Sequence, residues 1–225
     1  MVKFKKLIKN LPLMAAVVLA NPGYAENSVD IKEEIQRLSV VAPNIKKKAL
    51  ETALTAYKHA IEEGSVKKHI LTVIDYSLPS SAKRMWVFDL NSHKMLYNTF
   101  VAHGKNSGMT MAKHFSNKNH SLESSIGTFI TKDSYIGSKG YSLNLEGLEK
   151  GFNDNAFLRR VVVHGAWYVN QNFIKSSGRA GRSWGCPAVA TALARPIINA
   201  IKGGSVVFAY YPDKKYLSNS DYVVA

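Results

Sequence analysis

From His69 onward the chain is a series of short segments rich in Val, Ile, Thr, Phe and Tyr. This composition restricts the possible fold classes more than any other feature of the sequence. The segments are HILTVIDY, KRMWVFDL, MLYNTFVAHG, SIGTFITKDSY, RRVVVHGAWYV and GSVVFAYYP. β-Branched and aromatic residues favour strands, and separators such as SLPSS, DLNSHK and KGG supply the residues of turns. The pattern predicts a mainly β domain of the α+β class, with a helix in PAVATALARPIINAIKGG.

The segment before this domain has the three- and four-residue spacing of amphipathic helices. Gly64 offers a stop for a helix that begins after Pro43, and a shorter helix is expected near Asp30 to Leu38. The apolar stripe of the longer helix consists of Ile45, Ala49, Ala53, Leu54, Tyr57 and Ile61. Residues 26–66 are therefore predicted to be a helical extension that packs on the main domain or spaces it from a surface.

The first 25 residues have the order of a secretory signal peptide. MVKFKKLIKN carries four lysines and no acid, LPLMAAVVLA is apolar, and small residues precede Ala25. The apolar run is much shorter than the roughly 20 residues that span a bilayer. We expect cleavage after Ala25, export to the periplasm, and no stable membrane span in the mature chain.

The charge of the chain suggests its surroundings. The formal net charge is +14, and removing the four leader lysines leaves +10. For an exported protein this excess suits polyanionic cell-wall polymers or lipid headgroups before nucleic acid, with generic solubility as the alternative. No nucleic-acid partner is expected.

The single cysteine, Cys186, cannot form an internal disulfide, so it is an intermolecular bridge, an inert buried thiol or a reactive group. The run VVVHGAW ends in His164, 22 residues earlier. A free thiol, with a pKa of about 8.5, needs a base or a positive environment to become a nucleophile. A histidine at a strand end supplies such a base, and we expect an accessible thiol of low pKa that iodoacetamide modifies quickly at pH 7.

The residues beside the cysteine suit a positioned nucleophile. Gly185 allows a tight turn that aims peptide N–H groups at a carbonyl oxygen. Arg182 and Arg179 add a positive field that favours thiolate and holds a substrate carboxylate. Taken singly, a cysteine or a histidine is more often core filler; the combination in an exported chain favours catalysis.

The motifs HGAW and SWGCPAV together resemble the L,D-transpeptidase catalytic domain of the YkuD type, in which His-Gly precedes Ser-x-Gly-Cys. The resemblance covers roughly residues 68–212 and includes FDLNSHKMLYNTFVAHGKNSG and SSIGTFITK. It implies a β-sandwich or barrel domain over residues 67–213, a C-terminal tail over residues 214–225, and neither cofactor nor metal.

The resemblance also implies acyl transfer on peptidoglycan stem peptides. Cys186 would be the nucleophile, His164 its base, and the Gly165 carbonyl would orient the imidazole in place of a carboxylate. The amides of Gly185 and Cys186 would form the oxyanion hole, and Ser183 would support the loop.

One position departs from the family pattern. Ala188 stands where the family usually has an arginine two residues after the cysteine. Our hypothesis is that Arg182, or else Arg179, takes over that role. Tyr141 and Trp184 are further candidates for contact with substrate, although aromatics in a β-rich domain are usually packing residues.

Three other histidines have no clear catalytic context. His103, in VAHGKNSG, is expected to be a strand-end residue. His114 and His120 lack a third ligand at a recognised metal spacing, so KHFSNKNH is interpreted as a basic loop that caps the cleft.

Two other functions remain open from the sequence. An L,D-carboxypeptidase or other thiol hydrolase of the wall needs the same two residues, with water in place of the acceptor amine. A non-catalytic wall-binding module would use the basic surface and would not need Cys186. Papain-like enzymes usually place the cysteine before the histidine, and this chain has the reverse order. The linked stem positions and the oligomeric state do not follow from the sequence.

Overall fold

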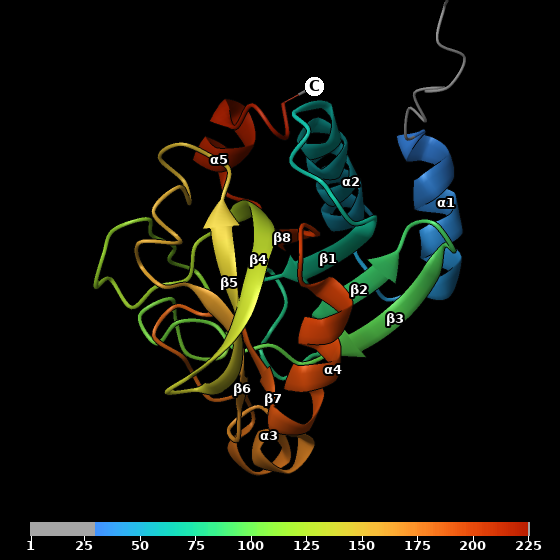
Figure 1. Cartoon of the computed structure of the whole chain (residues 1–225). Helices are drawn as coiled ribbons and strands as arrows, with labels where there is room; N and C mark the ends of the chain where they lie inside the picture. Colours follow the sequence, from blue (N-terminus) through green and yellow to red (C-terminus); the bar gives the residue numbers. More distant parts are fainter. Residues whose placement is uncertain (1–29, 225) are drawn as a thin grey trace, which may run out of the picture.

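In the computed structural model, which describes residues 30–224, eight strands form one sheet and the helices pack around it (Figure 1). The strands are β1 Ile70–Asp75, β2 Met85–Asp89, β3 Lys94–Thr99, β4 Gly127–Gly137, β5 Gly140–Gly147, β6 Val162–Ala166, β7 Ala188–Ala190 and β8 Val206–Tyr210. The helices are α1 Ile31–Val41, α2 Lys47–Glu62, α3 Gln171–Ser177, α4 Thr191–Ile201 and α5 Lys214–Asn219.

The sheet has the order β3-β2-β1-β8-β4-β5-β6-β7 and curves until its two edges meet. The pairs β1·β8 and β6·β7 are parallel, and the other neighbours are antiparallel. Ala102, just after β3, forms a bridge with Ala188 of β7, and its amide donates to the Ala188 carbonyl at 2.8 Å. The sheet is therefore close to a closed barrel, and the predicted mainly β domain is confirmed.

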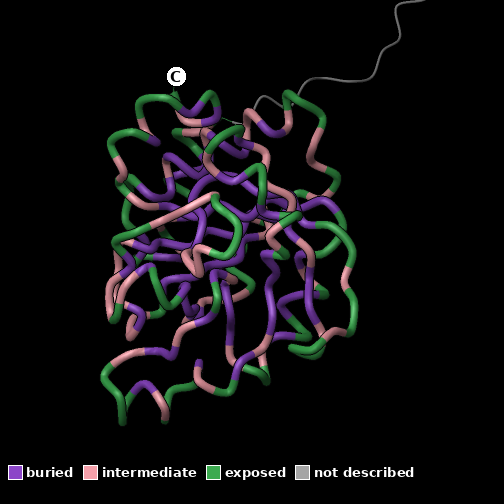
Figure 2. The backbone as a smooth tube through the Cα atoms, turned by 90° about the vertical axis from the view of Figure 1, so that its left-hand side faces the viewer, coloured by how far each residue is buried: buried purple, intermediate pink, exposed green. Residues whose placement is uncertain are grey.

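Strand β1 shows how the two faces of the sheet bury different cores. Leu71 and Val73 pack with α1 and α2, whereas Ile70 and Ile74 point into the other core, which includes residues of α4. Successive strand residues face opposite sides, so a strand covered on both faces reads as a continuous apolar run. In Figure 2 the buried segments accordingly gather at the centre, and exposed segments lie mostly in the outer loops.

The two N-terminal helices form as the sequence predicts, and they belong to the core of the sheet. Asp30 caps α1 by accepting hydrogen bonds from the amides of Lys32 and Glu33. Ala49 and Ala53 of α2 are fully buried, because small side chains let the helix approach the strands closely.

The C-terminal segment is not the tail expected from the sequence. Residues 214–219 form α5, and Tyr216 and Tyr222 are buried. The Tyr216 hydroxyl donates to the buried carboxylate of Glu149 at 3.0 Å, so a distant partner holds the segment in place.

Three further elements, β5, β7 and α3, are short or polar and were not predicted from the sequence. The expected signal peptide lies outside the described residues. Within residues 30–224, no helix is both long enough and apolar enough to span a membrane.

Candidate active site

His164 lies on β6, and its side chain points away from the core that includes residues of α4. Its neighbour Val163 points into that core, and alternation turns His164 the other way. His164 Nδ1 lies 2.9 Å from the Gly165 carbonyl oxygen. Because a carbonyl only accepts, Nδ1 carries the hydrogen and Nε2 has the free lone pair of a base. Burial lowers the pKa of His164, while the bond to Gly165 opposes the shift, so the resting imidazole is neutral.

Cys186 lies just before β7, the parallel neighbour of β6. His164 pairs with Ala188, two residues after Cys186. The Cys186 thiol contacts the Arg160 carbonyl and the Val162 amide, which stand just before His164 in the chain. The cysteine and the histidine therefore lie on neighbouring segments of the sheet.

The thiol of Cys186 is protonated at rest. Burial raises its pKa, and the Val162 amide, the charges of Arg159 and Lys139, and its own amide oppose this shift. The thiol donates to the Arg160 carbonyl oxygen, with a separation of 3.7 Å. The expectation of a low-pKa thiol is thus wrong for this resting structure, because desolvation outweighs the positive field.

The loop before Cys186 is held by Ser183. Its hydroxyl donates to the Cys186 carbonyl at 2.6 Å and accepts the Gly185 amide at 3.1 Å. The expectation that the Gly185 amide faces the substrate needs correction, because Ser183 already accepts its hydrogen. Gly185 has φ +126°, and a Cβ atom there would lie 2.8 Å from the Glu123 carbonyl oxygen, so the turn requires glycine.

Ser124 positions the peptide between Gly185 and Cys186. Its Oγ donates to the Gly185 carbonyl at 2.9 Å and accepts the Gly104 amide at 3.0 Å. Since the C=O and N–H of one peptide unit point in opposite directions, holding the Gly185 carbonyl also sets the direction of the Cys186 amide. The sequence gives no indication of this role, because Ser124 is one of several serines in SLESSIG.

Ala188 occupies a space that has no room for the arginine of the family pattern. It is fully buried and belongs to a small apolar cluster with Ala102, Ala166 and Val169. A guanidinium at this position would displace these side chains and lose its water.

A cavity of about 310 Å³ opens beside the thiol. Trp184 is 72% exposed and stands at its edge, with the Lys139 ammonium 5.5 Å from the ring centroid. His120 also lines the cavity, so the loop predicted to cap the cleft does border it. The cavity is lined by Asn119, His120, Leu122, Leu158, Arg159, Arg160, Val161, Trp184 and Cys186.

Three predicted substrate contacts lie outside this lining. Arg182 Nη1 donates to the Lys105 carbonyl at 2.9 Å, and Arg179 Nη1 donates to the Ala180 carbonyl at 3.0 Å. Tyr141 precedes Ser142, which pairs with His164, so alternation turns Tyr141 to the opposite face of the sheet. There the Tyr141 hydroxyl donates to Asn199 of α4 at 2.8 Å. In this structure Arg182, Arg179 and Tyr141 thus bond to other groups of the protein and do not line the cavity beside the thiol.

Arg159, which was not singled out from the sequence, is the arginine beside the thiol. It lines the cavity, and its charge acts on Cys186. Its guanidinium also donates to the carbonyls of Ser116 at 2.5 Å and Glu123 at 2.7 Å. Its place just before the apolar run that ends in His164 was the available sequence clue.

His103 is buried and structural. Its Nδ1 accepts from Arg84 at 2.8 Å, its Nε2 lies 3.2 Å from the Gly108 carbonyl, and its own carbonyl accepts the Ser183 amide. Burial and the Arg84 charge lower the pKa of His103 to about 4. Over residues 30–224, His, Cys, Asp and Glu form no group of three that could hold a metal ion.

The chain is similar to a protein family and to several solved structures. No curated protein matches the chain. Similar solved structures include the L,D-transpeptidase from Mycobacterium smegmatis, with 16% identity over 64% of this chain and 59% of that chain and a TM-score of 0.40. L,D-transpeptidase 1 from Mycobacterium tuberculosis has 15% identity over 64% and 62%, with a TM-score of 0.35.

The helical cell shape determining protein Pgp2 from Campylobacter jejuni has 10% identity over 72% of this chain and 57% of that chain, with a TM-score of 0.39. The chain spans about 59% to 62% of the length of the two mycobacterial structures. The assignment rests on the family comparison instead: residues 41–210 match the family described as the L,D-transpeptidase catalytic domain. Because this match covers most of the 225 residues and includes both His164 and Cys186, the chain belongs to the L,D-transpeptidase catalytic domain family.

Proposed function

We propose that this protein is an exported murein L,D-transpeptidase that cross-links peptidoglycan stem peptides in the periplasm through a thioester on Cys186. The observation that carries the proposal is the pairing of a histidine and a thiol. His164 is tied through Nδ1 to the Gly165 carbonyl, and Cys186 lies two residues before Ala188, the strand partner of His164.

In the first half-reaction His164 Nε2 takes the thiol proton as Sγ attacks the carbonyl carbon of an L,D peptide bond. The Cys186 amide, held in direction by Ser124, donates to the developing oxyanion. The imidazolium then gives its proton to the leaving amine, the C–N bond breaks, and the terminal D-amino acid departs. The result is a thioester between the stem and Cys186.

In the second half-reaction the amine of a neighbouring stem attacks the thioester carbonyl. His164 takes a proton from this amine and returns it to the departing thiolate, so a new amide forms and the thiol is restored. No nucleotide is consumed, because the energy of the broken peptide bond is kept in the thioester.

The neutral resting pair suits this sequence of steps. A thiol with a raised pKa and a histidine with a lowered pKa stay uncharged at rest, because burial disfavours the charged form of each. The ion pair then forms only as the substrate excludes water, beside the positive charges of Arg159 and Lys139. The mature charge of +10 also suits a polyanionic wall.

The test incubates the chain lacking residues 1–25 with disaccharide-tetrapeptide and disaccharide-tripeptide muropeptides, followed by mass spectrometry. Cross-linked dimers are expected from the native sequence and from the control His59→Gln, which alters a histidine of α2. Cys186→Ala and His164→Gln should form none. Shortened monomers without dimers would assign a carboxypeptidase, and identical products from Cys186→Ala would refute the catalytic proposal.

A further inference from the structure

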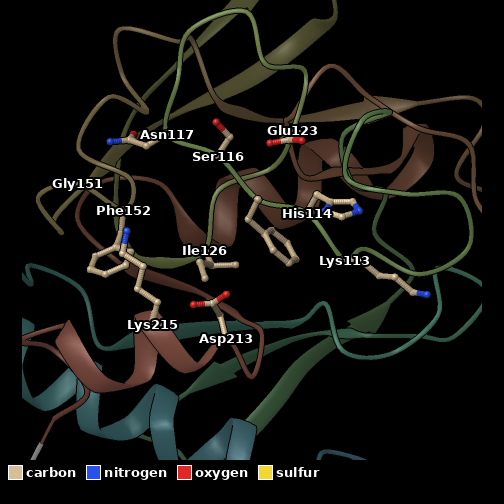
Figure 3. A pocket seen from close by; sticks show the side chains of 11 residues that line it. Lys113, His114, Ser116, Asn117, Glu123, Ile126, Gly151, Phe152, Asp213 and Lys215 are labelled. Carbon is tan, nitrogen blue, oxygen red and sulfur yellow. The ribbon is translucent and has the colours of Figure 1, made fainter.

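A second concavity, of about 430 Å³, is lined in part by the loop that also borders the Cys186 cavity, and Figure 3 shows its side chains. The loop, residues 116–125, turns Asn117 and Glu123 toward this pocket and His120 and Leu122 toward the thiol cavity. The two sites therefore share one wall, and the mechanism above uses only one of them.

The pocket carries charges of both signs. Glu123 stands on the upper wall, Asp213 rises opposite it, and Lys215 extends along Phe152 at the other end (Figure 3). Lys113 and His114 also line the pocket, and the Lys113 side chain extends away from Asp213 (Figure 3). Among the ion pairs between described residues, none includes Glu123, Asp213 or Lys215. Asp213 Oδ1 accepts the Tyr216 amide at 2.7 Å, and its other carboxylate oxygen is left for a ligand.

A few apolar side chains lie among the polar groups that make up most of this lining. Phe152 lies edge-on to Tyr216 with ring centroids 5.2 Å apart, and Ile126 is buried beneath the pocket. A fixed apolar floor between opposite charges suits a short aliphatic ligand that is charged at both ends.

The charge pattern separates the classes of ligand. A polyanion would meet the carboxylates of Glu123 and Asp213, and a polycation would meet Lys113 and Lys215. The described residues offer no triad of metal ligands here. A ligand with one ammonium and one carboxylate satisfies both ends of the pocket.

The shared wall links this pocket to the thiol. Arg159 donates to the backbone carbonyls of Ser116 and Glu123, both of which line the pocket. The same guanidinium acts on the Cys186 thiol. A ligand bound in the pocket would thus contact the segment whose carbonyls accept hydrogen bonds from Arg159.

We propose that this pocket binds a zwitterionic peptide end, with its ammonium between Glu123 and Asp213 and its carboxylate toward Lys215. This inference rests on the proposed function, under which the ligand is a neighbouring stem peptide that presents the side-chain amine of a diamino acid and the carboxylate of its C-terminal residue. The pocket is an anchoring site, separate from the site of bond formation, because the loop of residues 116–125 lies between it and the thiol.

The test is calorimetric titration of the Cys186→Ala chain, without residues 1–25, with Nα-acetyl-L-lysyl-D-alanine. Binding is expected, and acetylating the side-chain amine or amidating the carboxylate of this probe should each weaken it at least tenfold. The double variant Glu123→Gln/Asp213→Asn and the single variant Lys215→Met should weaken it to a similar extent. Asp213→Asn still allows the N-cap of α5, and Asp133→Asn, on the exposed part of β4, is the matched control.

The outcomes separate this proposal from the proposed function. Dimer formation without probe binding would overturn the pocket and leave the enzyme intact. Probe binding that depends on Glu123 and Asp213, in a chain that forms no dimers, would support the pocket alone. Binding that is unchanged in the double variant and lost in Trp184→Ala would place the probe in the thiol cavity and refute the inference.

Discussion

Replacing Ser124 by alanine should damage catalysis without touching either reacting residue. The Ser124 hydroxyl joins two buried backbone groups, the Gly185 carbonyl and the Gly104 amide. The variant leaves both without their partner. We expect the Gly185–Cys186 peptide to lose its fixed direction and the Cys186 amide to lose its aim at the oxyanion.

The magnitude follows from these two bonds. A buried polar group left unpaired costs about 1–3 kcal/mol, so Ser124→Ala, which leaves two such groups, should lower the free energy of unfolding by about 2–6 kcal/mol. Removing an oxyanion donor outright lowers kcat by about 10² to 10³. Because the Cys186 amide is displaced and not removed, we expect kcat to fall about tenfold to a hundredfold, with little change in KM.

The assay combines urea unfolding with initial rates of dimer formation, at a temperature where both variants are folded. Ser80→Ala is the matched control, since Ser80 is fully buried and its hydroxyl has no hydrogen-bond partner among the described residues. It should change unfolding by less than about 1 kcal/mol and leave kcat unchanged. A folded Ser124→Ala variant with the native kcat would refute the positioning role, and equal losses in the two variants would refute the hydrogen-bond reasoning.

Other consequences concern the charges around the site. Arg159→Met should lower kcat/KM at least tenfold. Arg182→Met loses only bonds to loop carbonyls, so its kcat/KM should stay within about threefold of the native value. A larger loss in Arg182→Met than in Arg159→Met, measured by initial rates, would restore the hypothesis for Arg182. Iodoacetamide should alkylate Cys186 slowly at pH 7 and about tenfold faster per pH unit until above pH 9, because burial raises the pKa of the thiol; rapid labelling at pH 7 would contradict this burial. His103 has a pKa of about 4 in the folded chain against about 6.5 in the unfolded chain. Its contribution to folding stability is therefore complete above pH 6.5 and is lost as the pH falls toward 4. The loss should approach about 3 kcal/mol, and urea unfolding of His103→Gln should depend less on pH than that of the native chain.

The sequence alone determined the elements whose cause is local. Six of the strands were predicted from runs of β-branched and aromatic residues, because these residue types favour the strand conformation wherever they cluster. Periodicity, with breaks at Pro43 and Gly64, likewise predicted α1 and α2. The candidate pair, His164 and Cys186, was available because each sits in a short motif and the chain has no second cysteine.

Only the tertiary structure decided which groups surround that pair. Ser124 reaches a carbonyl 61 residues away, and Arg159 holds carbonyls 36 and 43 residues away. Proximity in sequence favoured Arg182 for the positive charge, but side-chain direction gave that place to Arg159. The same limit applies to the C-terminal segment, because Tyr216 is held by Glu149, 67 residues earlier. Partners this far apart in the chain are chosen by how the barrel closes, and no local pattern of residues records that choice.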